Sequence, residues 1–235
     1  MMLLSAEQQR LFDDAQKIVF LTGAGVSTAS GIPDYRSKGG IYDDSGVVER
    51  PEYLLSTDAL NREPEKMYQF MKENMYFPDA KPNIIHQKMA ALTHQGRARI
   101  ITQNVDSLHT QAGAENVIEF HGSLYNIYAV TDGAPATFEA YMQDMRRADG
   151  ALLRPGITLY GEIPFHVTEA AQWVHEADLI VIVGTSFVVY PFAGLLQYAQ
   201  AQVPIIAVNL ETIPAPANVV QVIGDAQIYF DELRV

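Results

Sequence analysis

The chain contains no cysteine among its 235 residues. Disulfide bonds, zinc sites built on thiolates and cysteine nucleophiles are therefore excluded. The sequence also lacks an apolar run long enough to span a membrane. Its first residues, MMLLSAEQQR, have neither the basic segment nor the long apolar segment of a secretory signal peptide, so we expect a cytoplasmic protein.

Positive charge is scarce as well. Lysine and arginine number 16 against 28 aspartates and glutamates, which gives a formal net charge of −12 at pH 7. A surface of this sign repels nucleic acid and anionic membranes, so we expect neither as a partner. The charge suits a basic partner such as a lysine-bearing segment, although many acidic proteins have no such partner.

Short apolar runs alternate with helical patterns along the chain. Hydrophobic residues make up 48% of the sequence, enough for one large core or for a domain with a smaller lobe. We expect buried strands at 18–21, 99–102, 117–120, 157–160, 179–183, 205–210 and 219–223. Helices are expected after a capping box at Ser5-Ala6-Glu7-Gln8 and at 65–76, 85–93, 138–147, 169–177 and 192–202. This alternation predicts an α/β fold with a doubly wound parallel sheet.

The first predicted strand runs into a glycine turn, Thr22-Gly23-Ala24-Gly25. Such a turn presents backbone N–H groups to a pyrophosphate, and the helix that follows favours negative charge, so a dinucleotide site is expected here. Thr28 stands where the usual fingerprint has a third glycine, so an ordinary strand-to-helix turn remains the alternative. An acid, an aromatic ring and a base follow closely, at Asp34, Tyr35 and Arg36.

Small and polar residues gather at the carboxyl ends of the other predicted strands. In a parallel sheet these ends meet at one edge, where ligands bind, so we expect a single polar crevice. The residues expected to line it are Gln103, Asn104, Asp106, His121, Gly184, Thr185, Ser186, Asn209 and Glu211.

Most of these residues also have a purely structural interpretation. Residues 103–106 are typical of a turn, residues 184–186 are typical of a helix cap, and Glu211 suits either a ribose hydroxyl or a solvated turn. His121 is the candidate general base, because it lies between Phe120 and Gly122 at the rim and histidine titrates near neutral pH. The other five histidines show no metal-ligand spacing.

Six motifs occur in the order and spacing of one known family, from about residue 15 to residue 231. They are GAGVSTASGIPDYR at 23–36, TQNVD at 102–106, FHGSL at 120–124, RPGITLYGE at 154–162, GTSFVVYP at 184–191 and VNLE at 208–211. On these motifs the sequence resembles the sirtuins, which are NAD-dependent protein deacylases. The resemblance implies a Rossmann-like domain from residues 1–33, 78–121 and 157–235, with a small lobe from two insertions at 34–77 and 122–156.

The resemblance also implies roles for residues. His121, Asn104 and Asp106 would be catalytic, with Asn104 and Asp106 lining a nicotinamide pocket. An acyl-lysine peptide would pair as a strand between Gly161-Glu162 and Phe187-Val188-Val189. NAD, as a consumed co-substrate, would be held by Gly23, Ala24, Gly25, Asp34, Tyr35, Arg36, Gln103, Asn104, Asp106, Gly184, Thr185, Ser186, Asn209 and Glu211.

The implied reaction is deacylation of lysine, with nicotinamide and O-acyl-ADP-ribose as products. Transfer of ADP-ribose to a protein and hydrolysis of NAD are the alternatives, because both begin with the same bond cleavage. A nucleotide-sensing module without catalysis would not need His121. A dehydrogenase would usually carry an acid at the end of the second strand, where this chain has Gln103-Asn104.

Three departures from the family pattern stand out. Most sirtuins hold a structural zinc with two Cys-x-x-Cys pairs in the second insertion, whereas this chain has no cysteine. Tyr35 and Tyr160 replace phenylalanines, and Phe187 replaces a leucine at the peptide cleft. We therefore expect no metal, and expect residues 124–153 to fold through packing of Leu124, Tyr125, Tyr128, Phe138, Tyr141, Met142 and Met145.

Overall fold

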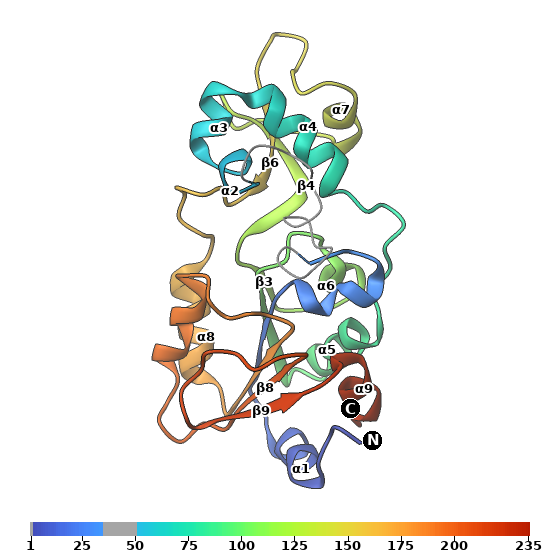
Figure 1. Ribbon diagram of the computed structural model, residues 1–235, viewed down its shortest axis with the longest axis vertical. Coiled ribbons are helices and arrows are strands. Elements are labelled where there is room, and N and C mark those ends of the chain that lie inside the picture. The colour runs from blue at the N-terminus through green and yellow to red at the C-terminus, as the bar shows by residue number, and fades with distance from the viewer. Residues whose placement is uncertain (1, 35–50) are drawn as a thin grey trace.

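The computed structural model describes residues 2–34 and 51–235. A parallel sheet with helices on both faces lies at one end of the molecule, and a smaller lobe of helices and antiparallel strands lies at the other (Figure 1). None of the helices in the described ranges is long and apolar enough to cross a membrane.

Six parallel strands form the large sheet, in the order β3-β2-β1-β7-β8-β9. The chain builds outward from β1 to β3 and then returns to the other side of β1 with β7, so the strand order reverses between β1 and β7. The predicted α/β class and doubly wound sheet are confirmed. The strands are β1 (Ile18–Thr22), β2 (Ala98–Thr102), β3 (Val117–Glu119), β7 (Leu179–Val183), β8 (Ile205–Asn209) and β9 (Val219–Ile223).

Both faces of the central strands are buried, which explains their uninterrupted apolar sequences. Successive side chains of a strand point to opposite faces, so Ile18 and Phe20 pack in one core while Val19 and Leu21 pack in the other. The first core is covered by α1 (Ala6–Asp14), α5 (Ile84–His94) and α9 (Ala226–Glu232), and the second by α8 (Val167–Glu176) and the 3₁₀ helix η3 (Phe192–Tyr198). The predicted capping box begins α1, since Ser5 Oγ accepts from Gln8 N at 3.1 Å and Ser5 N donates to Gln8 Oε1 at 3.0 Å.

Within the residues that the structure describes, the small lobe combines a three-stranded antiparallel sheet with four helices. Its strand order is β5-β4-β6. Its hydrophobic cores also take in Val105 and Leu159, which lie outside the two predicted insertions, and the predicted domain boundaries stay a prediction. The elements are β4 (Gly122–Ala129), β5 (Pro135–Ala136), β6 (Leu153–Ile157), α2 (Pro51–Leu54), α3 (Thr57–Arg62), α4 (Pro64–Asn74) and α7 (Phe138–Gln143).

Aromatic packing dominates the part of this lobe where we expected a metal-free fold. The Tyr68 and Tyr141 rings meet edge to face at 5.1 Å, and the Phe138 ring lies 5.0 Å from Tyr76 and 5.2 Å from Tyr125. Tyr68 also donates to the backbone oxygen of Tyr141 at 2.9 Å. Within residues 2–34 and 51–235, no group of three or more His, Cys, Asp or Glu side chains is arranged to hold a metal ion.

Several predicted elements were wrong in extent. The strand expected at 157–160 is β6, which lies at 153–157, and residues 158–160 form a loop with a single bridge from Tyr160 to Ser56. The helix expected to reach 147 ends at Gln143, because Asp144 turns extended and its carboxylate accepts from Arg146 N at 2.8 Å. The segment from 192 is 3₁₀ and ends at Tyr198.

Candidate functional site

A cavity of about 990 Å³ opens at the carboxyl ends of β1, β2, β7 and β8, where parallel sheets bind ligands. It brings together most residues that the sequence singled out. Asp106 and Phe187 do not line it, and Tyr35 and Arg36 lie outside the described residues. The predicted residues that do line it are Gly23, Ala24, Gly25, Asp34, Gln103, Asn104, His121, Gly161, Glu162, Gly184, Thr185, Ser186, Val188, Val189, Asn209 and Glu211.

The floor of the cavity is a backbone contact between the loops after β1 and β7. Gly23 N donates to Val183 O at 3.1 Å, and Gly25 N donates to Gly184 O at 2.8 Å. A Cβ on Gly25 would lie 2.7 Å from Gly184 Cα, which explains the glycine. These N–H groups are therefore already used within the protein. Between them, the Ala24 N–H has no acceptor among the described residues and stays available to a ligand.

A hydrogen-bonded row of side chains crosses the strand ends beside this floor. Gln103 Nε2 donates to Thr185 Oγ1 at 2.8 Å, and Thr185 N donates to Asn209 Oδ1 at 2.8 Å. Asn209 is 8% exposed, and its Nδ2 has no partner in the described part of the chain. A buried amide N–H without an acceptor is costly, so this position suits a ligand oxygen such as a sugar hydroxyl.

A second network joins the loop after β2 to the 3₁₀ turns η1 (Ala24–Val26) and η2 (Thr28–Ser30). Ser27, between the two turns, donates through Oγ to Asp106 Oδ2 at 2.6 Å and accepts from Asn104 Nδ2 at 3.0 Å. Leu108 N, at the start of α6 (Leu108–Gln111), donates to Asp106 Oδ1 at 2.9 Å. Burial raises the pKa of Asp106 and outweighs the opposing effect of these hydrogen bonds. Asp106 therefore positions Ser27 and Asn104 from behind the cavity wall.

His121 presents a neutral imidazole to the cavity. Its Nδ1 lies 3.3 Å from the backbone oxygen of Gln103, and since a carbonyl only accepts, Nδ1 carries the proton. Burial lowers the pKa of His121, and the Gln103 carbonyl only partly offsets this. The ring packs edge to face on Phe120 at 5.5 Å. Nε2 therefore keeps its lone pair and is able to accept a proton.

Two buried histidines pack against the end of β1, next to the glycine turn and on the side away from the cavity. Thr22 Oγ1 at the end of β1 lies 3.1 Å from His109 Nε2, and the His109 ring lies 4.8 Å from the ring of His86 on α5. At the start of the same helix, Asn83 Nδ2 donates to Val26 O at 2.8 Å. Helix α5 and the turn after β1 are thus fixed to each other through side chains.

The predicted peptide cleft has free backbone groups on both sides. The N–H groups of Gly161 and Val188 have no acceptor in the described ranges, as pairing with an added strand requires. The side chain of Glu162 is not free, because both of its oxygens bind Arg154. Phe187 is 5% exposed and packs on Phe192, so its side chain belongs to the core of the sheet domain.

Sequence reasoning missed several residues of this site. Ser27 carried no signal beyond its place in a glycine-rich turn. Tyr190 is 71% exposed at the mouth of the cavity, in a motif quoted only for the family resemblance. Apart from the predicted Glu211, the far end of the cavity is formed by Leu210 and by residues 212–214 and 224–227, after β8 and β9, whose sequences resemble ordinary turns.

A cavity lined by the polar residues that follow the strands, at the point where a doubly wound sheet reverses its strand order, is typical of a nucleotide-binding α/β protein. The profile of the Sir2 family matches residues 23–191. The chain belongs to the Sir2 family, as the motifs indicated.

Two curated relatives and two solved structures show how far the similarity extends. The NAD-dependent protein deacetylase of Lactiplantibacillus plantarum is 45% identical over 230 residues, 97% of each chain. That of Enterococcus faecalis is 52% identical over 197 residues, 83% of this chain and 81% of the relative. A Sir2 homologue in complex with ADP-ribose superposes with a TM-score of 0.88 at 34% identity, covering 97% of this chain and 94% of its own. A Sir2 with a deacetylated p53 peptide and 3′-O-acetyl ADP-ribose gives 0.88 at 31% identity, covering 98% and 96%.

Proposed function

We propose that the protein removes acetyl groups from lysine side chains of proteins and consumes NAD in doing so. The observation that carries this proposal is the neutral His121 facing a nucleotide-sized cavity at the end of β3. The name NAD-dependent protein deacetylase, shared by relatives that match nearly the whole chain, supports it. So does a Sir2 structure with a deacetylated peptide and an acetylated ADP-ribose.

The described residues suit NAD at two independent places. The Ala24 N–H is the free donor on the floor, and Asn209 Nδ2 is a buried donor without an acceptor. We propose that Ala24, Gln103, Ser186, Asn209 and Glu211 hold the nucleotide, with Tyr35 and Arg36 as further candidates outside the described residues. NAD supplies the electrophilic ribose carbon and leaves as nicotinamide and O-acetyl-ADP-ribose.

The contribution of the protein is positioning and one proton acceptor. We propose that His121 Nε2 takes a proton from a sugar hydroxyl while Nδ1–H stays on the Gln103 carbonyl. Asn104 faces the same cavity and is fixed by Ser27, which Asp106 holds in turn. The ring of Phe120, fully buried beside Phe192, closes the wall behind His121.

We further propose that the small lobe needs no zinc. Interlocking rings and the ion pairs of Arg147 with Asp132 and Asp149, both at 2.7 Å, connect its distal segments. Treatment with a strong chelator should leave the melting temperature and the activity unchanged. A fall in either one, restored by added zinc, would contradict this proposal.

The activity is tested by mass spectrometry of the purified protein with NAD and an acetyl-lysine peptide, with chelator present. We expect deacetylated peptide and O-acetyl-ADP-ribose to form in equal amounts. His121→Ala should lose at least about 100-fold in peptide deacetylation, the typical contribution of a general base. Release of nicotinamide without deacetylation by the wild-type protein would overturn the proposal in favour of ADP-ribosyl transfer or NAD hydrolysis.

A further inference from the structure

A half-buried ion pair closes the loop that leads from β6 to the rim of the cavity. Arg154 Nη1 lies 2.6 Å from Glu162 Oε1, and Arg154 Nη2 lies 3.1 Å from Glu162 Oε2. The side chains are 7% and 31% exposed. A planar guanidinium facing both oxygens of one carboxylate fixes orientation as well as distance. The two ends of the loop are therefore held at one separation.

The remaining hydrogen bonds of both side chains go to the backbone between them. Arg154 Nε donates to Pro155 O in β6 at 3.2 Å. Arg154 Nη2 donates to Ile157 O at 2.6 Å, and Leu159 N donates to Glu162 Oε2 at 2.8 Å. Burial alone raises the pKa of Glu162, but the bonds from Arg154 and Leu159 outweigh it, so the net pKa is lowered. The ion pair thus organises the backbone between its members and remains charged at neutral pH.

This loop connects the small lobe to the backbone of the candidate base. Thr158 N donates to His121 O at 2.8 Å. On the other side, Tyr160 N donates to Leu55 O at 2.9 Å, and Thr57 N donates to Tyr160 O at 3.0 Å. Gly161 follows with φ of 99°, a conformation that favours glycine, and its N–H has no acceptor within the described ranges.

We propose that Arg154 and Glu162 are positioning residues for the acetyl-lysine substrate, holding the loop so that the backbone of Gly161 stays open to a substrate strand. This inference rests on the proposed function. No hydrogen bond in the described part of the chain links either side chain to the residues proposed to hold NAD. Loosening the ion pair should therefore weaken binding of the peptide and spare that of NAD.

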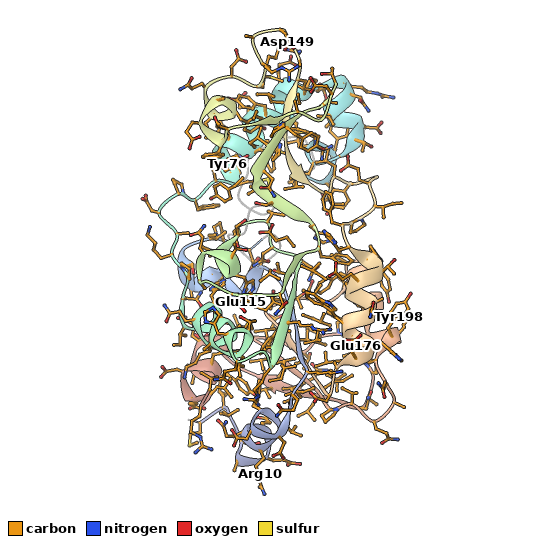
Figure 2. All side chains as sticks on the ribbon, turned by 180° about the vertical axis from the view of Figure 1, so that it is seen from behind. Arg10, Tyr76, Glu115, Asp149, Glu176 and Tyr198 are labelled. Carbon is orange, nitrogen blue, oxygen red and sulfur yellow. The ribbon has the colours of Figure 1, made fainter. Side chains whose placement is uncertain are left out.

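The test compares Glu162→Gln with a matched control. Glutamine keeps the shape of glutamate but removes the charge and one acceptor. We expect KM for an acetyl-lysine peptide to rise about tenfold, equivalent to about 1.4 kcal/mol. KM for NAD and kcat should stay within about twofold, the signature of lost substrate binding. Glu176→Gln is the control. Glu176 lies on α8 (Figure 2), pairs with Arg99 of β2 at 2.8 Å, and neither residue lines the cavity, so this variant should change none of these constants.

A second variant separates positioning from folding. Arg154→Met combined with Glu162→Leu leaves no unpaired buried charge, so the protein should stay folded while the loop is released. KM for the peptide should remain about tenfold raised in this variant. The inference is overturned if both variants keep the wild-type KM for the peptide, or if KM for NAD rises in parallel. A wild-type protein that deacetylates no peptide would refute the proposed function and this inference with it.

Discussion

Acid should destabilise this protein through two neutral histidines buried under the glycine turn. His86 is fully buried and His109 is 2% exposed. Burial lowers the pKa of His86 to about 4. It also lowers the pKa of His109 well below the usual range, with a smaller contribution from the charge of His86. His86 Nδ1 accepts from Asn83 N, so the neutral ring carries its proton on Nε2, and a second proton would have to displace this hydrogen bond. His109 Nδ1 has no hydrogen-bond partner among the described residues that would stabilise a proton there.

The sign and size follow from the difference between folded and unfolded chains. An unfolded histidine binds a proton below about pH 6.5, whereas His86 in the folded protein resists it down to about pH 4. Stability is therefore fully present above about pH 6.5, falls as the pH is lowered toward 4, and stops falling below that. At about pH 5 the loss from His86 alone is about 2 kcal/mol, and His109 adds to it.

The substitution His86→Gln isolates the contribution of His86 to the pH dependence of the free energy of unfolding. His86 is the third residue of α5 and its Nδ1 accepts from Asn83 N, a position where glutamine also completes a capping box. Urea unfolding followed by the fluorescence of the single tryptophan, Trp173, gives the free energy of unfolding at each pH. Between about pH 7.5 and pH 5 the wild type should lose about 2 kcal/mol more than the variant.

Equal losses in the two proteins would refute the reasoning. They would mean that the imidazole of His86 titrates in the folded protein as it does in the unfolded chain, and therefore that it is hydrated. Carboxylates common to both proteins cancel in the comparison, so acid unfolding by other groups does not imitate the expected difference.

Three other substitutions test the site and the small lobe. Gly25→Ala places a Cβ 2.7 Å from Gly184 Cα, so it should cost about 1–3 kcal/mol of stability and raise KM for NAD. Ser27→Ala removes a hydrogen bond that lowers the pKa of Asp106, so this pKa should rise and the loss of kcat/KM at acid pH should begin at a higher pH. If the pH at which kcat/KM falls does not change, Asp106 is not the group whose protonation lowers kcat/KM. Tyr68→Phe loses the bond to Tyr141 O, so unfolding should become easier by about 1 kcal/mol with KM for NAD unchanged.

The large sheet was predictable because its strands are buried on both faces. Residues 179–183 and 18–21 consist entirely of branched or aromatic apolar residues, and runs this short that end at a turn favour a buried strand over a helix. The small sheet was not predictable in the same way. A register shift between Ser123 and Ile127 breaks the alternation of β4, and Pro155 interrupts the sequence of β6.

The site was predictable where one strand end provides several residues together. Residues 103–104 and 184–186 follow strands directly, so the parallel topology alone brings them to one cavity. Contacts between side chains that are far apart in the sequence leave no pattern from which they could be predicted. Asp106 binds Ser27, and Glu162 binds Arg154 rather than facing the cleft with a free carboxylate. Both partners of each contact can be read from the sequence, but the backbone turn that brings one side chain to the other cannot.

The closely packed glycines under the cavity restrict which amino-acid substitutions this part of the protein can accept. Gly23, Gly25 and Gly184 are so close that none can gain a side chain unless the opposite loop withdraws, and withdrawal would break β1 away from β7 at the centre of the sheet. A single substitution that reshapes the floor therefore destabilises the centre of the sheet. New preferences for a nucleotide or an acyl group would therefore have to arise in the walls, at positions such as Leu210 and Tyr190, whose side chains are 74% and 71% exposed.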